Sequence, residues 1–170
     1  MIKFLNSESE YVQWLELTDI ISSVYKTVLF GCLYVPPQNS KYSSEEAFNE
    51  IENEYIDFSK HFEHSLLIGD YNAKTSDLND FLIPNDNLLE ILDIADDDEL
   101  LKEFYDYENL LRCGVPLQRY TQDKSRPNKF GRRLLELCQN CSLYIANSRI
   151  YKDKGIGKCT CKDFTVGDYV

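Results

Sequence analysis

The sequence lacks any long hydrophobic segment. None of its apolar runs approaches the roughly 18 residues that a membrane-spanning helix requires. The first residues turn polar at Asn6, too early to build the apolar region of a secretory signal peptide. These absences exclude membrane spanning and secretion through a cleaved signal peptide. We therefore expect an intracellular protein, nuclear or cytoplasmic, with no membrane partner.

The chain also lacks a disulfide framework, internal repeats and low-complexity linkers. Its six cysteines lie at irregular positions: 32, 113, 138, 141, 159 and 161. A chain of 170 residues with 43% apolar side chains can bury a sizeable core without covalent cross-links. We therefore expect reduced thiols and one domain over residues 1–170.

Basic residues are scarce in most of the chain. Residues 1–108 contain 6 Lys and Arg against 24 Asp and Glu, whereas residues 109–170 contain 12 against 5. The overall net charge of −11 disfavours nucleic acid, because a phosphate backbone repels an acidic surface. The basic last third of the chain could nevertheless contact a polyanion.

The acidic charge is concentrated in residues 90–108, which hold nine carboxylates and one lysine, Lys102. The composition predicts a solvated surface helix or loop. The alternative is a metal cluster, which is disfavoured because the segment lacks the glycine turn that an EF-hand loop requires.

Hydrophobic periodicity predicts alternating strands and helices. Continuous apolar runs indicate buried strands at 28–35 and 65–69, and a further strand at 143–147. Ser43 and Glu46 form a capping-box pattern before an apolar stripe that ends at Phe62, and a second stripe runs from Phe130 to Cys141. This order predicts a layered α/β fold. Residues 164–170 have the composition of a strand with no signal for its end, so we expect further sequence beyond Val170.

Asp70 and Asn72 follow directly after the predicted strand at 65–69. Two residues apart in an extended exit, their side chains can point to the same side and reach a common ligand. A carboxylate and a carboxamide can together hold and deprotonate a water beside a phosphate or a metal ion. The alternative is a capped turn with a purely structural role.

Four sequence blocks in a fixed order resemble the endonuclease/exonuclease/phosphatase family, and within it the endonuclease domains of non-LTR retrotransposon reverse transcriptases. The resemblance covers almost the whole chain apart from an acidic insertion at about residues 90–125. The blocks are Leu33–Pro37, Leu67–Ala73, Asn128–Cys138 and Asp168–Val170.

The resemblance implies a partial two-sheet α/β sandwich that hydrolyses phosphodiester or phosphomonoester bonds with Mg²⁺ and acts on nucleic acid. Tyr34 would donate to the scissile phosphate, Asp70 would deprotonate the attacking water and bind the metal, and Asn72 would hydrogen-bond a phosphate oxygen. Asp168 would orient a catalytic histidine. Asn128 and Thr160 would contact the substrate.

Each of these residues also has a structural interpretation. Tyr34 could cap the sheet, and Asp168 could pair with a lysine of the basic tail. The chain also departs from the family pattern. The family has a metal-binding glutamate upstream of the first matching segments and a catalytic histidine downstream of the last, and this sequence has no position that matches either. Its two histidines, His61 and His64, lie elsewhere and are expected to be solvated surface residues rather than a metal pair. We therefore expect weak or no catalysis from a domain incomplete at both ends, with a non-catalytic remnant as the alternative.

A second alternative is a zinc-stapled interaction module, because two pairs of thiols lie near the carboxyl end of the sequence. They are Cys138 with Cys141, and Cys159 with Cys161. Cys138 also continues the apolar stripe of the second predicted helix, which favours a buried core thiol instead.

Overall fold

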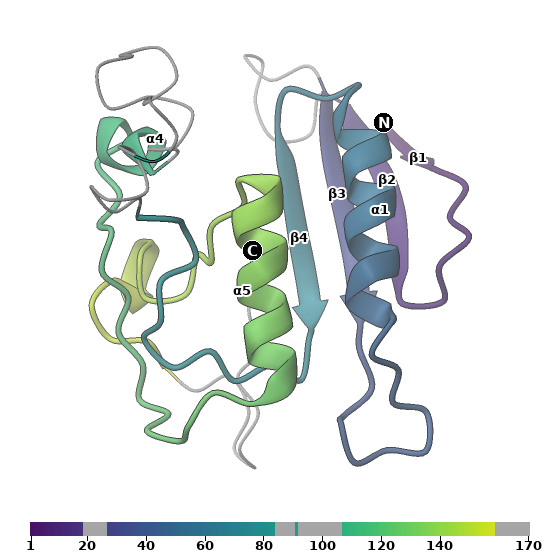
Figure 1. Ribbon diagram of the computed structural model, residues 1–170. Helices are drawn as coiled ribbons and strands as arrows, with labels where there is room; N and C mark the ends of the chain where they lie inside the picture. The colour runs from purple at the N-terminus through teal and green to yellow at the C-terminus, as the bar shows by residue number, and fades with distance from the viewer. Residues whose placement is uncertain (19–26, 84–90, 92–106, 159–170) are drawn as a thin grey trace.

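The computed structural model describes residues 1–18, 27–83, 91 and 107–158, and shows a mixed α/β fold (Figure 1). Within these ranges the strands form one four-stranded open sheet in the order β1-β2-β3-β4. The first three strands pair antiparallel, and β3 pairs parallel to β4. The strands are β1 (Ile2–Phe4), β2 (Val12–Thr18), β3 (Thr27–Tyr34) and β4 (Ser65–Asp70).

The two longer helices, α1 (Ala47–Ser59) and α5 (Lys129–Cys141), lie on the same face of the sheet (Figure 1). Helix α1 connects the parallel strands β3 and β4, as a crossover connection must. A short helix, α4 (Glu108–Arg112), and a 3₁₀ turn, η1 (Tyr151–Asp153), lie on the far side of α5 from the sheet (Figure 1).

The core fills the space between the sheet and these two helices. Trp14, Leu29 and Leu67 from the sheet are fully buried and pack with Ile51 of α1 and Leu134 of α5. Gly31 makes room for the indole, because a Cβ at this position would lie 2.7 Å from Trp14 Cζ3. The prediction from the helical spacing is therefore confirmed: the apolar face of each helix packs onto the sheet.

The opposite face of the sheet is also apolar. Side chains alternate along a strand, so the residues that flank the buried set in each strand point away from α1 and α5, and their cross-strand partners point the same way. Ile2 and Phe4 on this face are 57% and 71% exposed, and Leu15, Phe30 and Ile68 are half-buried. None of the described helices covers this face, which we call the reverse face.

Most predicted elements are confirmed, but the capping box is wrong. Helix α1 begins after Glu46, and no side chain caps its amino terminus. The Ser43 backbone N–H donates to Ser40 in a preceding turn, and the Ser44 hydroxyl accepts from the Glu46 N–H. The serines are thus used in a turn before the helix, which shortens the helix at its start.

The strand predicted at 143–147 is also wrong, because this segment has irregular structure. The Leu143 N–H closes the end of α5 on the Cys138 carbonyl, and the Ile145 N–H donates to the buried Asp80 carboxylate at 2.6 Å. The backbone groups that a ladder would need are therefore already paired. The side chains of Leu143 and Ile145 still enter the core.

Two predictions fall on parts of the chain that the structure leaves undescribed. The strand at 164–170 lies outside the described residues, as does most of the acidic segment at 90–108. Within the proposed insertion, residues 107–125 contain α4 followed by irregular structure. Among the described residues, no helix is both long and apolar enough to cross a bilayer.

Candidate functional site

The carboxyl ends of β3 and β4 bring two of the predicted site residues together. Tyr34 and Asp70 are the last residues of these parallel strands and are direct partners in the strand register. Both side chains therefore leave the sheet on the reverse face. Tyr34 is 56% exposed and Asp70 is half-buried, so a ligand at this edge can reach both groups.

The loop after β4 holds the third predicted residue, Asn72, in a fixed turn. Asp70 Oδ1 accepts a hydrogen bond from the Asn72 backbone N–H at 2.9 Å, and Asn72 adopts a left-handed φ of 47°. Asparagine tolerates this conformation better than most residues. The capped turn, which was the structural alternative for Asp70 and Asn72, is therefore present. It fixes the position of the Asp70 carboxylate.

The Asn72 side chain links the exits of the two strands. Its Nδ2 donates to the Val35 carbonyl at 2.9 Å, and the Val35 N–H donates to the Asp70 carbonyl at 2.8 Å. Asn72 is 7% exposed, so its carboxamide lies below the surface rather than in solvent. These two hydrogen bonds join the segments that follow β3 and β4 into one rigid unit.

Asn128 fastens this unit to helix α5, for which it is the N-cap. Its Oδ1 accepts from the Gly131 N–H at 2.7 Å and from the Lys74 N–H at 2.9 Å, while its Nδ2 donates to the Asn72 carbonyl at 3.0 Å. The approach is close, because a Cβ on Gly131 would lie 1.9 Å from the Lys74 carbonyl oxygen. The residue predicted to contact substrate thus joins the candidate loop to α5.

A buried ion pair that the sequence analysis missed holds the chain beyond this loop. Arg149 donates to both oxygens of Asp80, at 2.5 and 2.8 Å, and both side chains are almost wholly buried. Arg149 also donates to the carbonyls of Pro116, Leu117 and Ile145. The two partners are 69 residues apart in the chain, and neither lies in a recognisable motif, so no sequence signal could have paired them.

The candidate metal ligands are few in the described part of the chain. There, no group of three or more His, Cys, Asp or Glu side chains could hold a metal ion. Asp70 is the single carboxylate at the strand exits, and its Oδ2 has no hydrogen-bond partner among the described residues. Asp168 and Thr160 lie outside the described residues.

The histidines and thiols lie away from this site. His61 is exposed just after α1, and His64 is half-buried just before β4. Cys138 is fully buried in the core, as its place in the apolar stripe predicts. Burial, reinforced by the nearby Glu52 carboxylate, raises the pKa of Cys141 to about 12 and disfavours the thiolate that zinc requires. Cys159 and Cys161 lie outside the described residues.

Comparison of the chain with known protein families, with curated proteins and with solved structures finds no match. The resemblance to the endonuclease/exonuclease/phosphatase family therefore rests on the four sequence blocks. Its bearing on function must be argued from the residues gathered at the ends of β3 and β4.

Proposed function

We propose that the chain is a Mg²⁺-dependent phosphodiester hydrolase domain, endonuclease-like and of non-LTR retrotransposon origin within the endonuclease/exonuclease/phosphatase family. The observation that supports this most is the convergence of Tyr34, Asp70 and Asn72 at two adjacent strand ends. Tyr34 and Asp70 come from sequence blocks that are far apart, yet folding places their polar groups at one edge, and Asn72 fixes the carboxylate there. Ligand sites of α/β folds lie at such carboxyl ends.

The geometry suggests a division of labour in phosphodiester hydrolysis. The Asn72 N–H fixes Asp70 Oδ1, which leaves Oδ2 to accept the proton of an attacking water. The exposed Tyr34 phenol can donate to a phosphate oxygen and stabilise its developing charge. The buried Asn72 carboxamide donates to Val35, so its part is to hold the two strand exits and the Asp70 carboxylate in place beside the phosphate.

A single carboxylate is compatible with Mg²⁺ binding. Proteins often bind Mg²⁺ through one or two carboxylates, and substrate phosphate and water supply the other ligands. We propose Asp70 as the ligand that this part of the chain supplies. A bound Mg²⁺ would neutralise charge on the phosphate.

The reverse face supports the sandwich part of the proposal. A sheet that is apolar on both faces is built to be covered on both, and α1 and α5 cover only one. We propose that the reverse face packs against a second sheet, which would make the described fold one half of a sandwich. Tyr34 and Asp70, which also point to this side, would then lie at the rim between the two sheets.

Nicking of supercoiled plasmid by the purified chain tests the proposed activity. We expect weak nicking with Mg²⁺, none with EDTA, and none above background in Asp70→Ala, because removing a general base costs about 10²–10⁴-fold in rate. Asp77→Ala is the matched control, because Asp77 is an exposed carboxylate in the same loop region. Circular dichroism should show that both variants fold.

Two results would contradict the proposal. Mg²⁺-dependent nicking that survives in Asp70→Ala would place the chemistry elsewhere in the chain. Wild-type nicking no higher than that of Asp70→Ala would favour the alternative, a remnant of the domain without catalysis.

A further inference from the structure

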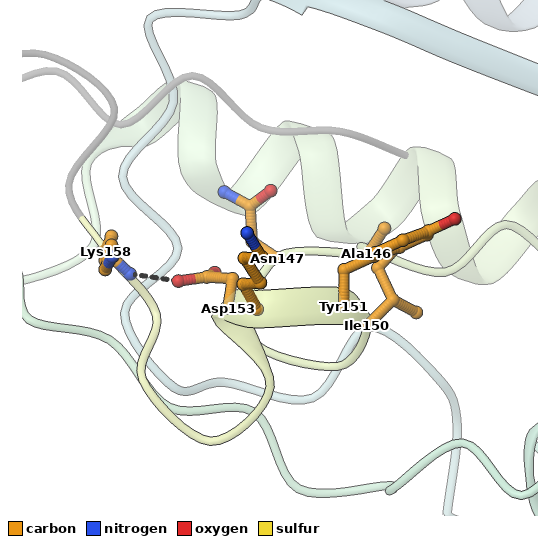
Figure 2. A pocket seen from close by; sticks show the side chains of 7 residues that line it. Ala146, Asn147, Ile150, Tyr151, Asp153 and Lys158 are labelled. Carbon is orange, nitrogen blue, oxygen red and sulfur yellow. Dashed lines mark hydrogen bonds between the residues drawn. The ribbon is translucent and has the colours of Figure 1, made fainter.

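A hollow in the molecule lies outside the candidate site. It is a cavity of about 360 Å³ around η1 and the residues that precede it. This is within the range of about 300–1,000 Å³ that is typical of small-ligand sites. Figure 2 shows its wall, where Ala146, Ile150 and the ring of Tyr151 contribute carbon atoms. The remaining lining residues are Asn147, Lys152, Asp153 and Lys158.

The loop that builds this cavity is fixed internally by one carboxylate. Asp153 Oδ2 accepts from the Ser148 N–H and Oδ1 accepts from the Lys158 N–H, both at 2.9 Å (Figure 2 draws the second bond). The Gly155 N–H also donates to the Ser148 carbonyl at 2.7 Å. Asp153 therefore ties the two ends of the loop together through backbone hydrogen bonds.

Tyr151 stands at the edge of the cavity with its ring in solvent. It is 93% exposed, and its φ of 53° places an aromatic residue in the left-handed region, which bulky side chains rarely adopt. The bonds that close the loop hold it there. An aromatic ring presented in this way offers a flat stacking surface.

The surroundings of the ring are basic. Lys152, Lys154 and Lys158 are all exposed, and none forms an ion pair with a carboxylate in the described part of the chain. Asp153 accepts its bonds from backbone N–H groups and keeps its negative charge. Three lysines and one carboxylate thus lie within seven residues around one exposed ring, which leaves a net positive charge there.

A second pocket adjoins the first, and its charged lining residues are Lys158, the buried Arg119 and one carboxylate, Asp123. It shares Asn147 and Lys158 with the first and is lined on its other side by Thr75 and Ser76. These two residues follow the loop in which Asn72 is fixed. The second pocket therefore places the segment after β4 next to the surface around Lys158.

We propose that this cavity binds single-stranded nucleic acid, with a base stacked on Tyr151 against the apolar wall and the adjoining phosphates on Lys152, Lys154 and Lys158. Stacking on exposed aromatic side chains beside a basic groove is how single strands are bound without sequence preference. The inference deepens the proposed function, because it names an unpaired strand as the nucleic acid that this surface holds near the hydrolytic site, and it rests on that function for its link to hydrolysis.

Fluorescence anisotropy with a labelled oligothymidylate of about 15 nucleotides tests the inference, within the site sizes known for single-strand binders. EDTA in the buffer prevents cleavage, so binding is measured apart from catalysis. We expect Tyr151→Ala to weaken binding by about 5- to 100-fold, as the loss of one stacked base does. Each Lys→Gln change at 152, 154 or 158 should reduce the salt slope of binding by about 0.7.

Tyr42→Ala is the matched control, because Tyr42 is another exposed tyrosine, 67% accessible, in the loop before α1. The inference is overturned if Tyr151→Ala binds as tightly as the wild type, if Tyr42→Ala loses as much affinity, or if duplex DNA binds more tightly than the single strand. Binding that depends on Tyr151 in a chain that does not nick plasmid would refute the proposed function alone. Nicking that is lost in Asp70→Ala, beside oligonucleotide binding indifferent to Tyr151, would refute this inference alone.

Discussion

At the scale of single residues, a few buried or half-buried side chains hold segments that have no regular structure. Glu54 of α1 is one of them. Its Oε1 accepts from the backbone N–H groups of Glu8 and Ser9, and its Oε2 accepts from the Ser7 hydroxyl and the Trp14 indole. One carboxylate thus fixes the loop between β1 and β2 to the helix and satisfies the polar atom of the largest core side chain.

These bonds make the protein's stability depend on pH. Partial burial by itself raises the pKa of Glu54, but the four hydrogen bonds outweigh it and hold the pKa below its ordinary value of 4.5. A carboxyl group whose pKa falls on folding stabilises the native state fully above 4.5, and that contribution is lost as the pH falls through the folded-state pKa.

Glu54→Gln should therefore destabilise the protein at neutral pH. The amide nitrogen would face hydrogen-bond donors, and losing bonds to a charged group costs about 1.5–3 kcal/mol. Urea unfolding at pH 7 should show this loss, and the difference from wild type should shrink below pH 4.5. Glu63→Gln, at an exposed position, is the control. A difference that stays constant down to acid pH would contradict the role of the Glu54 charge.

Sequence alone could locate Tyr34, Asp70 and Asn72, because each occupies a strand end that hydrophobic runs mark clearly. It could not find the Asp80–Arg149 pair, which depends on contacts between segments distant in the chain. Hydrophobic periodicity depends only on residues close together in the sequence. It therefore cannot reveal an ion pair between residues far apart in the chain.

At the scale of elements, prediction succeeded where a hydrophobic pattern decides the structure and failed where side chains take over backbone bonds. Helix α5 follows its apolar stripe, and its N-cap is the first residue of the Asn128–Cys138 block. The segment at 143–147 has the apolar composition of a strand, but the Asp80 carboxylate accepts the Ile145 N–H. Strand β1 was not predicted, since its three residues are too few to show a period.

The N-cap of α5 offers a test at this scale. Asn128→Ala removes the cap and the bonds to the loop after Asn72. A lost cap costs about 0.5–2 kcal/mol and an unpaired buried backbone group about 1–3 kcal/mol, so we expect about 2–4 kcal/mol in all. Asn128→Asp keeps the Oδ1 acceptor and the cap but sets a carboxylate oxygen against the Asn72 carbonyl in place of the donor, and should cost less than Asn128→Ala because the cap remains. Thermal unfolding followed by circular dichroism measures both.

The order of these two variants decides whether Asn128 acts as a structural joint. Equal losses in both would mean that the donor to Asn72 carries the effect and the cap adds nothing. No loss in either would show that the loop and α5 stay together without this residue, which would leave its polar atoms available for substrate as the sequence resemblance implies.

At the scale of the whole molecule, the charge and the apolar surface are unevenly distributed. The basic residues of the last third include the three lysines around Tyr151, so the acidic net charge does not describe the surface that would meet a polyanion. The reverse face is the other asymmetry, because its apolar residues lie on strands whose opposite side is already buried. An exposed apolar face of this kind favours association.

We expect the purified chain to self-associate through the reverse face and Phe4→Lys to reduce that association. Phe4 is 71% exposed on the edge strand β1, where a lysine blunts edge pairing and removes apolar surface. Because so exposed a side chain contributes little to the core, the melting temperature should change by no more than a few degrees. Sedimentation velocity over a range of concentrations measures the association, with Tyr42→Lys as an equally exposed control away from the sheet. A wild-type chain that sediments as a monomer at every concentration would show that the reverse face is covered, and a large fall in melting temperature in Phe4→Lys would show that something packs on it within the same molecule.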